Sequence, residues 1–288
     1  MRQPAVAGQF YEGTKEGLLK QIEWCYKHQI GPRKLPEVRE GPRSLLGLVS
    51  PHAGYMYSGP VAAHGFVELA ADGRPDSFVI LGPNHHGLGS GVSLRSVGRW
   101  RTPLGEVLID TSLAKEILKN SDLIDDEEMA HLYEHSIEVQ LPFLQHLYGE
   151  IKFVPISMML QDLRTDLEVG RAVGEACRGK NVVVIASTDF THYEPHSQAV
   201  RRDQMAIKRI LELDARGLVE TVEREGLSMC GYGPVAAMLE ATSLMGARKA
   251  KLLKHATSGE TSGMMGEVVG YASIAIYKQA SSEEFSTL

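Results

Sequence analysis

Continuous apolar runs bounded by turn-forming residues are the feature that most limits what this chain can fold into. The clearest span residues 45–50 (LLGLVS), 77–82 (SFVILG), 151–157 (IKFVPIS), 181–187 (NVVVIAS) and 267–277 (EVVGYASIAIY). A strand that is apolar throughout is typical of a sheet buried on both faces. These runs therefore predict a buried β-sheet that is mostly parallel or mixed.

Helical patterns lie between the apolar runs, at about residues 14–29, 59–70, 112–120, 135–148, 163–177, 197–213 and 233–245. Strands that alternate with helices favour an α/β fold in which helices cover both faces of the sheet. No segment looks like an interdomain linker. We therefore expect a single domain over residues 1–277, followed by a polar and disordered tail at 278–288.

Composition excludes several classes of partner. The formal charge is −6 and no region concentrates Lys and Arg, which argues against nucleic-acid binding. The N-terminus lacks the features of a signal peptide, and no apolar run approaches the roughly 18 residues that span a bilayer. The three cysteines are widely spaced and odd in number, as is usual in a reducing compartment. We expect a cytoplasmic protein without a membrane partner.

Polar residues follow three of the apolar runs directly. The run 45–50 leads into PHAGY with His52, the run 77–82 into PNHHG with His85, and the run 181–187 into TDFTH with Asp189 and His192. Ligands of open parallel sheets bind beyond the carboxyl ends of the strands. The pattern thus predicts one crevice that contains all four side chains.

Two further segments carry residues of the same chemical kind. Cys230 lies in MCGYGP, just before an apolar helix whose dipole favours the thiolate. His135 and Glu138 of EHSIE lie three apart at an expected helix start, so that one reaches the site while the other orients it. Imidazoles, a thiolate and a carboxylate together suit Fe(II), Zn(II) or Cu.

Each residue also has an ordinary structural interpretation. A histidine in a turn is usually a helix cap or a surface residue, and a lone cysteine such as Cys230 is usually a small buried hydrophobe. Asp189 fits a helix cap, and Glu138 fits a solvated helix face. A nucleophilic Cys230 paired with His192 requires the fold to bring them together, and no GxSxG motif is present. The coincidence at three strand ends favours a functional site.

Seven ordered motifs give the chain a family resemblance. They are AGQFYEG, PHAGYMYSGPVAAH, LGPNHHG, RTPLGE, EHSIEVQLPFL, STDFTHY and MCGYGP. Over about residues 2–277 the sequence resembles the Memo family, named for a mediator of receptor-driven cell motility. That family is similar in fold to class III extradiol ring-cleaving dioxygenases, in which two histidines and a glutamate hold non-haem Fe(II).

The resemblance implies roles for individual residues. His52 and His85 match the two histidine ligands, and Cys230 falls where the dioxygenases have their carboxylate ligand. Three catalytic residues are implied beside the metal, namely His192, Asp189 and His135. Of these, His192 matches the acid/base histidine of the dioxygenases.

Aromatic residues are expected to form the substrate-binding wall of the same pocket, because such rings exclude water and pack against organic ligands. We expect Phe10, Tyr11 and Tyr55 there. Phe10 stands where animal members of the family have a Trp that lines a peptide-binding cleft.

The expected function is therefore a mononuclear Fe(II) or Cu site, with Zn as a further possibility, that performs redox or oxygenase-type chemistry on a small substrate, aromatic molecules being one candidate class. One alternative is a non-enzymatic protein that binds a peptide or phosphate group in the same pocket. Another is a hydrolase that depends on Cys230 or on Zn.

Overall fold

The centre of the sheet is parallel and contains four of the strands that the sequence predicts. In the computed structural model, which describes residues 1–278, these strands lie in the order β1 (Leu45–Ser50), β8 (Val182–Ser187), β2 (Ser77–Pro83) and β7 (Lys152–Met158). Because all four run in the same direction, their carboxyl ends lie at one edge of the sheet.

Antiparallel pairs extend the sheet on both sides and make it mixed. β11 (Val268–Lys278) runs antiparallel to β1, and β10 (Ala247–Thr257) pairs with β11. At the other side, β3 (Val92–Leu94) runs antiparallel to β7. The shorter strands are β4 (Arg99–Thr102), β5 (Gly105–Ile109), β6 (Asp125–Asp126) and β9 (His192–Glu194).

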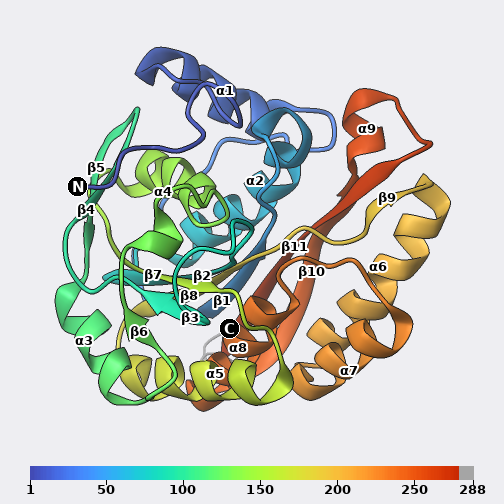
Figure 1. The fold of residues 1–288 in the computed structure, drawn as a ribbon. Helices are drawn as coiled ribbons and strands as arrows, with labels where there is room; N and C mark the ends of the chain where they lie inside the picture. Colours follow the sequence, from blue (N-terminus) through green and yellow to red (C-terminus); the bar gives the residue numbers. More distant parts are fainter. Residues whose placement is uncertain (279–288) are drawn as a thin grey trace, which may run out of the picture.

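Helices form a layer on each face of this sheet (Figure 1). One layer contains α1 (Lys15–Lys27), α2 (Tyr55–Asp72) and α4 (Leu141–Tyr148). The other contains α3 (Thr111–Lys119), α5 (Leu163–Cys177), α6 (His196–Leu211), α7 (Ala215–Glu225) and α8 (Tyr232–Leu244). The remaining helices are η1 (Met129–His131), η2 (Glu138–Gln140) and α9 (Ser258–Ser262).

Side chains of the central strands alternate between the two layers, as the pleat requires. Phe78 and Ile80 of β2 pack against the first layer, whereas Val79 and Leu81 pack against the second. This two-sided burial explains why the strands are apolar throughout. The predicted α/β fold, with helices on both faces of a mixed sheet, is confirmed.

Three local predictions need correction. The helix expected at 135–148 begins only with η2 and α4, so His135 lies in the preceding turn. Helix α7 was not anticipated. The lysine-rich edge strand β10 was also missed, because charged edge strands lack the apolar signature of central ones. Lys278, assigned to the tail, ends β11, and the rest of the predicted tail, 279–288, lies outside the described residues.

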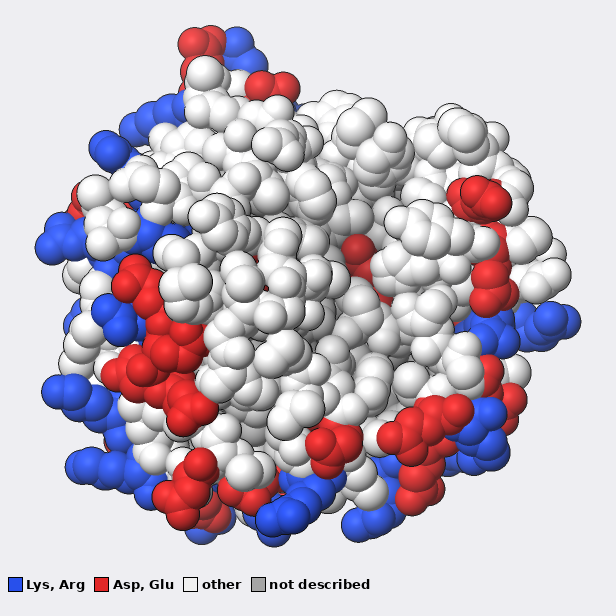
Figure 2. All heavy atoms as spheres, viewed as in Figure 1, with Lys and Arg blue, Asp and Glu red and all other residues white. Residues whose placement is uncertain are grey.

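Two observations bear on the expected partners. Within residues 1–278, no helix has the length and apolar character that crossing a membrane requires. Figure 2 shows a face whose charged residues gather at the margin, where Lys and Arg alternate with Asp and Glu. That face has no broad basic patch of the kind that nucleic acids bind.

Candidate metal centre

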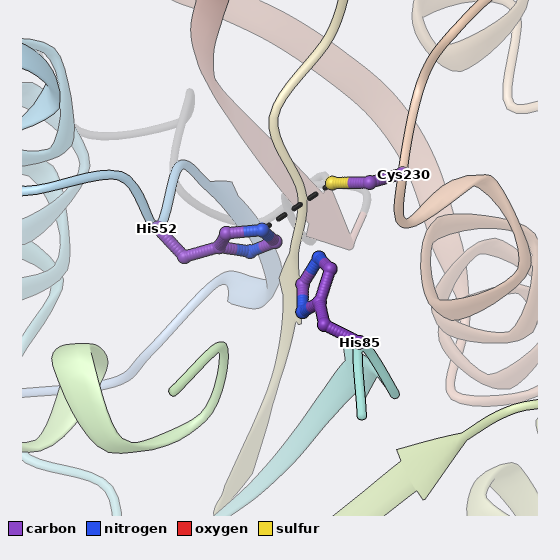
Figure 3. A group of neighbouring side chains, drawn as sticks. All are labelled: His52, His85 and Cys230. Carbon is purple, nitrogen blue, oxygen red and sulfur yellow. Dashed lines mark hydrogen bonds between the residues drawn. The ribbon is translucent and has the colours of Figure 1, made fainter. Parts of the chain in front are cut away.

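Three potential metal ligands converge at the carboxyl edge of the sheet. His52 follows β1, His85 follows β2, and Cys230 lies in the turn before α8. Their ligand atoms all lie within 4.8 Å of one another (Figure 3). His52 Nε2 and Cys230 Sγ are 3.3 Å apart, close to the roughly 3.6 Å that bonds of about 2.1 and 2.3 Å to one tetrahedral ion would give.

Hydrogen bonds fix which nitrogen of His52 carries the proton. Ser187 Oγ donates to the Ser136 carbonyl oxygen at 2.6 Å, so it has no hydrogen left for the imidazole. His52 Nδ1, 2.9 Å from the same oxygen, must therefore be the donor. Burial lowers the pKa of His52 well below its ordinary value, which keeps the ring neutral. Its Nε2 lone pair thus faces Cys230 and is free for a metal.

Glu134 orients His85 in an equivalent way. Its carboxylate accepts hydrogen bonds from His85 Nδ1 at 2.9 Å and from the His85 amide at 2.6 Å. Burial opposes protonation of His85, but the hydrogen bond and charge of Glu134 outweigh it and raise the His85 pKa. Nδ1 is occupied by this bond, which leaves Nε2 as the nitrogen available to a metal.

Sequence reasoning did not single out Glu134, and paired His135 with Glu138 instead. Glu134 also receives the amides of His135 and Ser136, each at 2.8 Å, so it shapes the turn as well as orienting His85. The available signal was its position directly before His135 in the EHSIE motif. His85, Glu134 and His135 form a second group of possible ligands, but the bond to His85 Nδ1 makes Glu134 a supporting residue.

Glu138 is fully buried, not solvated as its ordinary interpretation required, and among the described residues its carboxylate hydrogen-bonds no histidine. Its carboxylate accepts hydrogen bonds from Arg2 Nη1 at 2.6 Å, from the amides of Ala5 and Val6, and from Tyr11 Oη at 2.6 Å. It therefore fastens the N-terminal segment to the turn that carries His135.

Cys230 is half-buried, and the surroundings of its thiol correct the predicted thiolate. Burial raises the pKa of its thiol above the ordinary value, with the nearby Asp189 carboxylate adding to the effect. The helix dipole is thus outweighed by the cost of burying a charge. The Asp189 amide nevertheless points at Cys230 Sγ, 3.3 Å away, and would stabilise a thiolate formed by metal binding.

Asp189 lies beside His52, and His192 lies near enough for its charge to act on the pKa values of His52 and Asp189. Asp189 Oδ1 accepts the His52 amide at 2.8 Å, and its Oδ2 lies 3.9 Å from His52 Nε2. Burial raises the pKa of Asp189 to about 6. His192 Nδ1 lies 2.8 Å from the Ser228 carbonyl oxygen, which can only accept, so His192 Nε2 is the free nitrogen.

His135 stacks on His85 with ring centroids 4.7 Å apart, and its ring also lies 5.3 Å from that of His52. Burial lowers the pKa of His135 to about 4, so the ring is neutral at physiological pH. The ring of Phe10 also packs against His135, with the two ring centroids 4.7 Å apart. His135 is thus held among three rings at the edge of the candidate centre.

The structure places the three expected wall residues in two different surroundings. Phe10 contacts His135, whereas Tyr11 and Tyr55 are each 2% exposed and lie in the core. Their hydroxyls are bound to Glu138 Oε1 and to the Val139 carbonyl oxygen, which draws both rings inward. In this structure those two rings contact each other in the core and offer a ligand almost no surface. A substrate contact for Phe10 stays a prediction.

Comparisons with known proteins agree over nearly the whole chain. A family model described as Memo-like protein matches residues 2–275. A MEMO1 family protein of Methanopyrus kandleri is 55% identical over 276 residues, covering 95% of this chain and 98% of its own. Another, from Pyrobaculum aerophilum, is 50% identical over 280 residues, with 96% and 99% covered.

A solved structure supports the architecture. An uncharacterised Escherichia coli K12 protein superposes with a TM-score of 0.54, covering 80% of this chain and 99% of its own. With 16% sequence identity, this likeness concerns the fold alone.

Proposed function

Because this chain belongs to the Memo-like protein family, we propose that it binds one Fe(II), Cu or Zn ion through His52, His85 and Cys230. The observation that supports this best is the convergence of the three ligand atoms within 4.8 Å. Two imidazole nitrogens and a sulfur suit these metals, whereas Mg²⁺ and Ca²⁺ prefer oxygen. Fe(II) is our leading choice for redox or oxygenase-type chemistry on a small substrate.

The ligand set fits a catalytic site better than a structural one. Structural zinc sites use four protein ligands, while catalytic metals retain an open position. Three side chains supply the donors here, and His85 is solvent-accessible. A bound ion of this kind would supply a Lewis-acidic or redox-active centre at that open position.

The surrounding residues are arranged to handle protons. Asp189 Oδ2 lies 3.9 Å from His52 Nε2, so this carboxylate can accept a substrate proton beside the metal ligands. His192 presents a free Nε2 from a ring anchored by Ser228, so it can carry a proton between site and solvent. Neutral His135 and Phe10 form one side of the space beside His85.

The test is anaerobic titration of metal-free protein with Fe(II), Cu(I) and Zn(II). Cys230→Ser should lose most of the affinity, since a hydroxyl remains protonated where a thiol can become a thiolate. Cys177→Ala is the matched control, because Cys177 is buried in the core away from the site. Equal affinities for wild type and Cys230→Ser would leave His52, His85 and Asp189 as a two-histidine, one-carboxylate set.

One observation favours a second candidate function, a thiol-dependent hydrolase. His52 Nε2 lies 3.3 Å from Cys230 Sγ and its Nδ1 is held by Ser187, which resembles a cysteine nucleophile with an oriented base. His52, not the expected His192, is the partner. Rapid alkylation of Cys230 by iodoacetamide in metal-free protein near pH 7, together with absent metal binding, would support this alternative.

A further inference from the structure

The direction of the Cys230 side chain depends on a short turn without regular structure. Residues 226–231 connect α7 to α8, and the Cys230 amide donates to the Asp189 carbonyl oxygen over 3.3 Å, a long hydrogen bond. The two histidines, by contrast, follow directly from strands of the central sheet. Something besides the turn itself must fix Cys230 opposite His52.

Gln161 makes the contacts that hold this turn. It lies in the loop between β7 and α5, and its Nε2 donates to the Cys230 carbonyl oxygen at 2.9 Å. Its Oε1 accepts the Gly233 amide at 2.9 Å, and its own carbonyl oxygen accepts Tyr232 Oη at 2.6 Å. The Gln161 side chain thus bridges Cys230, in the connecting turn, and Gly233, in the first turn of α8.

The turn packs closely against its neighbours at two glycines. A Cβ atom at Gly231 would lie 2.5 Å from the Ser187 carbonyl oxygen, and one at Gly233 would lie 2.8 Å from Gln161 Cγ. The Gly231 amide also donates to Thr188 Oγ1 at 3.0 Å. The turn is therefore pressed between the end of β8 on one side and Gln161 on the other.

We propose that Gln161 is a positioning residue for the candidate metal centre, holding the Cys230 main chain so that Sγ faces the two histidines. This inference rests on the proposed function, since it assigns Gln161 an effect on metal binding through Cys230. Gln161 touches neither the histidines nor the metal position by any hydrogen bond among the described residues. Supporting residues of this kind typically change metal affinity about 10- to 100-fold when they are lost.

The experiment uses Co(II), whose thiolate-to-metal charge-transfer absorption reports a Cys ligand. Gln161→Ala should weaken Co(II) binding by about 10-fold or more and reduce that absorption per bound ion. Gln145→Ala is the matched control: Gln145 is also hydrogen-bonded, to Thr102, but lies in α4 away from the site. It should leave both measurements unchanged.

A double-mutant cycle separates positioning from general loss of structure. If Gln161 acts through Cys230, then Gln161→Ala should have no further effect on affinity in a Cys230→Ser background. An equal loss with and without Cys230, or wild-type absorption in Gln161→Ala, would overturn the inference. Should Gln161→Ala not fold, as judged by circular dichroism, Gln161→Met retains the volume and removes both hydrogen bonds.

Failure of the proposed function gives a different result. Wild-type protein that binds no Co(II), Fe(II), Cu(I) or Zn(II) would refute the metal centre and, with it, any role for Gln161 there. Wild-type binding together with an unaffected Gln161→Ala variant would refute the positioning role alone.

Discussion

Different neighbours hold the proton on Nδ1 of His52 and of His85, so that Nε2 of each ring is available to a metal. A serine hydroxyl, its hydrogen already committed to a carbonyl oxygen, receives the proton of His52 Nδ1. A buried carboxylate, Glu134, receives that of His85. In both cases the supporting residue determines the tautomer, and the histidine alone does not. Such partners are set by the tertiary structure, which is why the sequence indicated the histidines and not their supports.

The burial of Asp166 should lower the stability of the folded protein near neutral pH. It lies in the first turn of α5, is fully buried, and both its carboxylate oxygens lack hydrogen-bond partners among the described residues. Burial, together with the charges of Asp162 and Glu223, raises its pKa from 3.8 to about 8. Near neutral pH the folded protein therefore keeps this side chain protonated.

Asp166→Asn should stabilise the metal-free protein increasingly as pH rises. Below about pH 4, wild-type Asp166 is protonated in both states and costs nothing; as pH rises toward 8, the unfolded chain ionises and stability is lost. The difference between variant and wild type should reach a few kcal/mol by pH 8. Urea unfolding from pH 4 to 8 measures it, with exposed Asp122→Asn as control. Parallel curves for wild type and Asp166→Asn would contradict this.

At the scale of elements, predictions succeeded where the signal was local. The central strands are apolar throughout because both faces are covered, so their ends, and the turns that bear His52 and His85, could be located from sequence. Glu138 shows where such reasoning stops. Its partner Arg2 lies 136 positions away, and no local pattern indicates that the two meet in the interior.

That long-range pair fastens the N-terminal segment to the candidate site. Arg2 is stacked over Trp100, and its guanidinium donates to Glu138 and to the carbonyl oxygens of His131 and Glu134. Both side chains of the ion pair are almost fully buried. The segment that carries His135 is thus held from beneath by residues from the start of the chain.

Glu138→Gln should destabilise the protein by about 3–5 kcal/mol, since it leaves the buried Arg2 charge without its counterion. Chemical denaturation gives the change in free energy of unfolding. The exposed pair Lys20–Glu16 provides the comparison: Glu16→Gln should change stability by less than about 0.5 kcal/mol. Similar small effects in both variants would show that the buried pair does not anchor the segment.

Across the whole molecule, the candidate centre connects parts that fold into separate layers. His52 precedes α2 of one helix layer, while Cys230 precedes α8 of the other, and the sheet between them supplies His85 from β2. Segments 178 positions apart in sequence therefore meet at the His52–Cys230 contact. A ligand set assembled from distant segments exists only in the folded chain, so metal binding and folding stability are coupled.

This coupling predicts that a redox-inert metal raises the melting temperature. At a free Zn(II) concentration of 100 times Kd, the folded state should gain about 2.7 kcal/mol. For a chain of 288 residues this corresponds to a rise of roughly 4–5 °C. His52→Ala should abolish the rise, because it removes a ligand atom from the centre. His64→Ala is the control: His64 Nε2 is bonded to the Ile30 carbonyl oxygen and is outside the ligand set, so this variant should retain the full shift. An equal rise in His52→Ala and wild type would place the bound zinc elsewhere on the molecule.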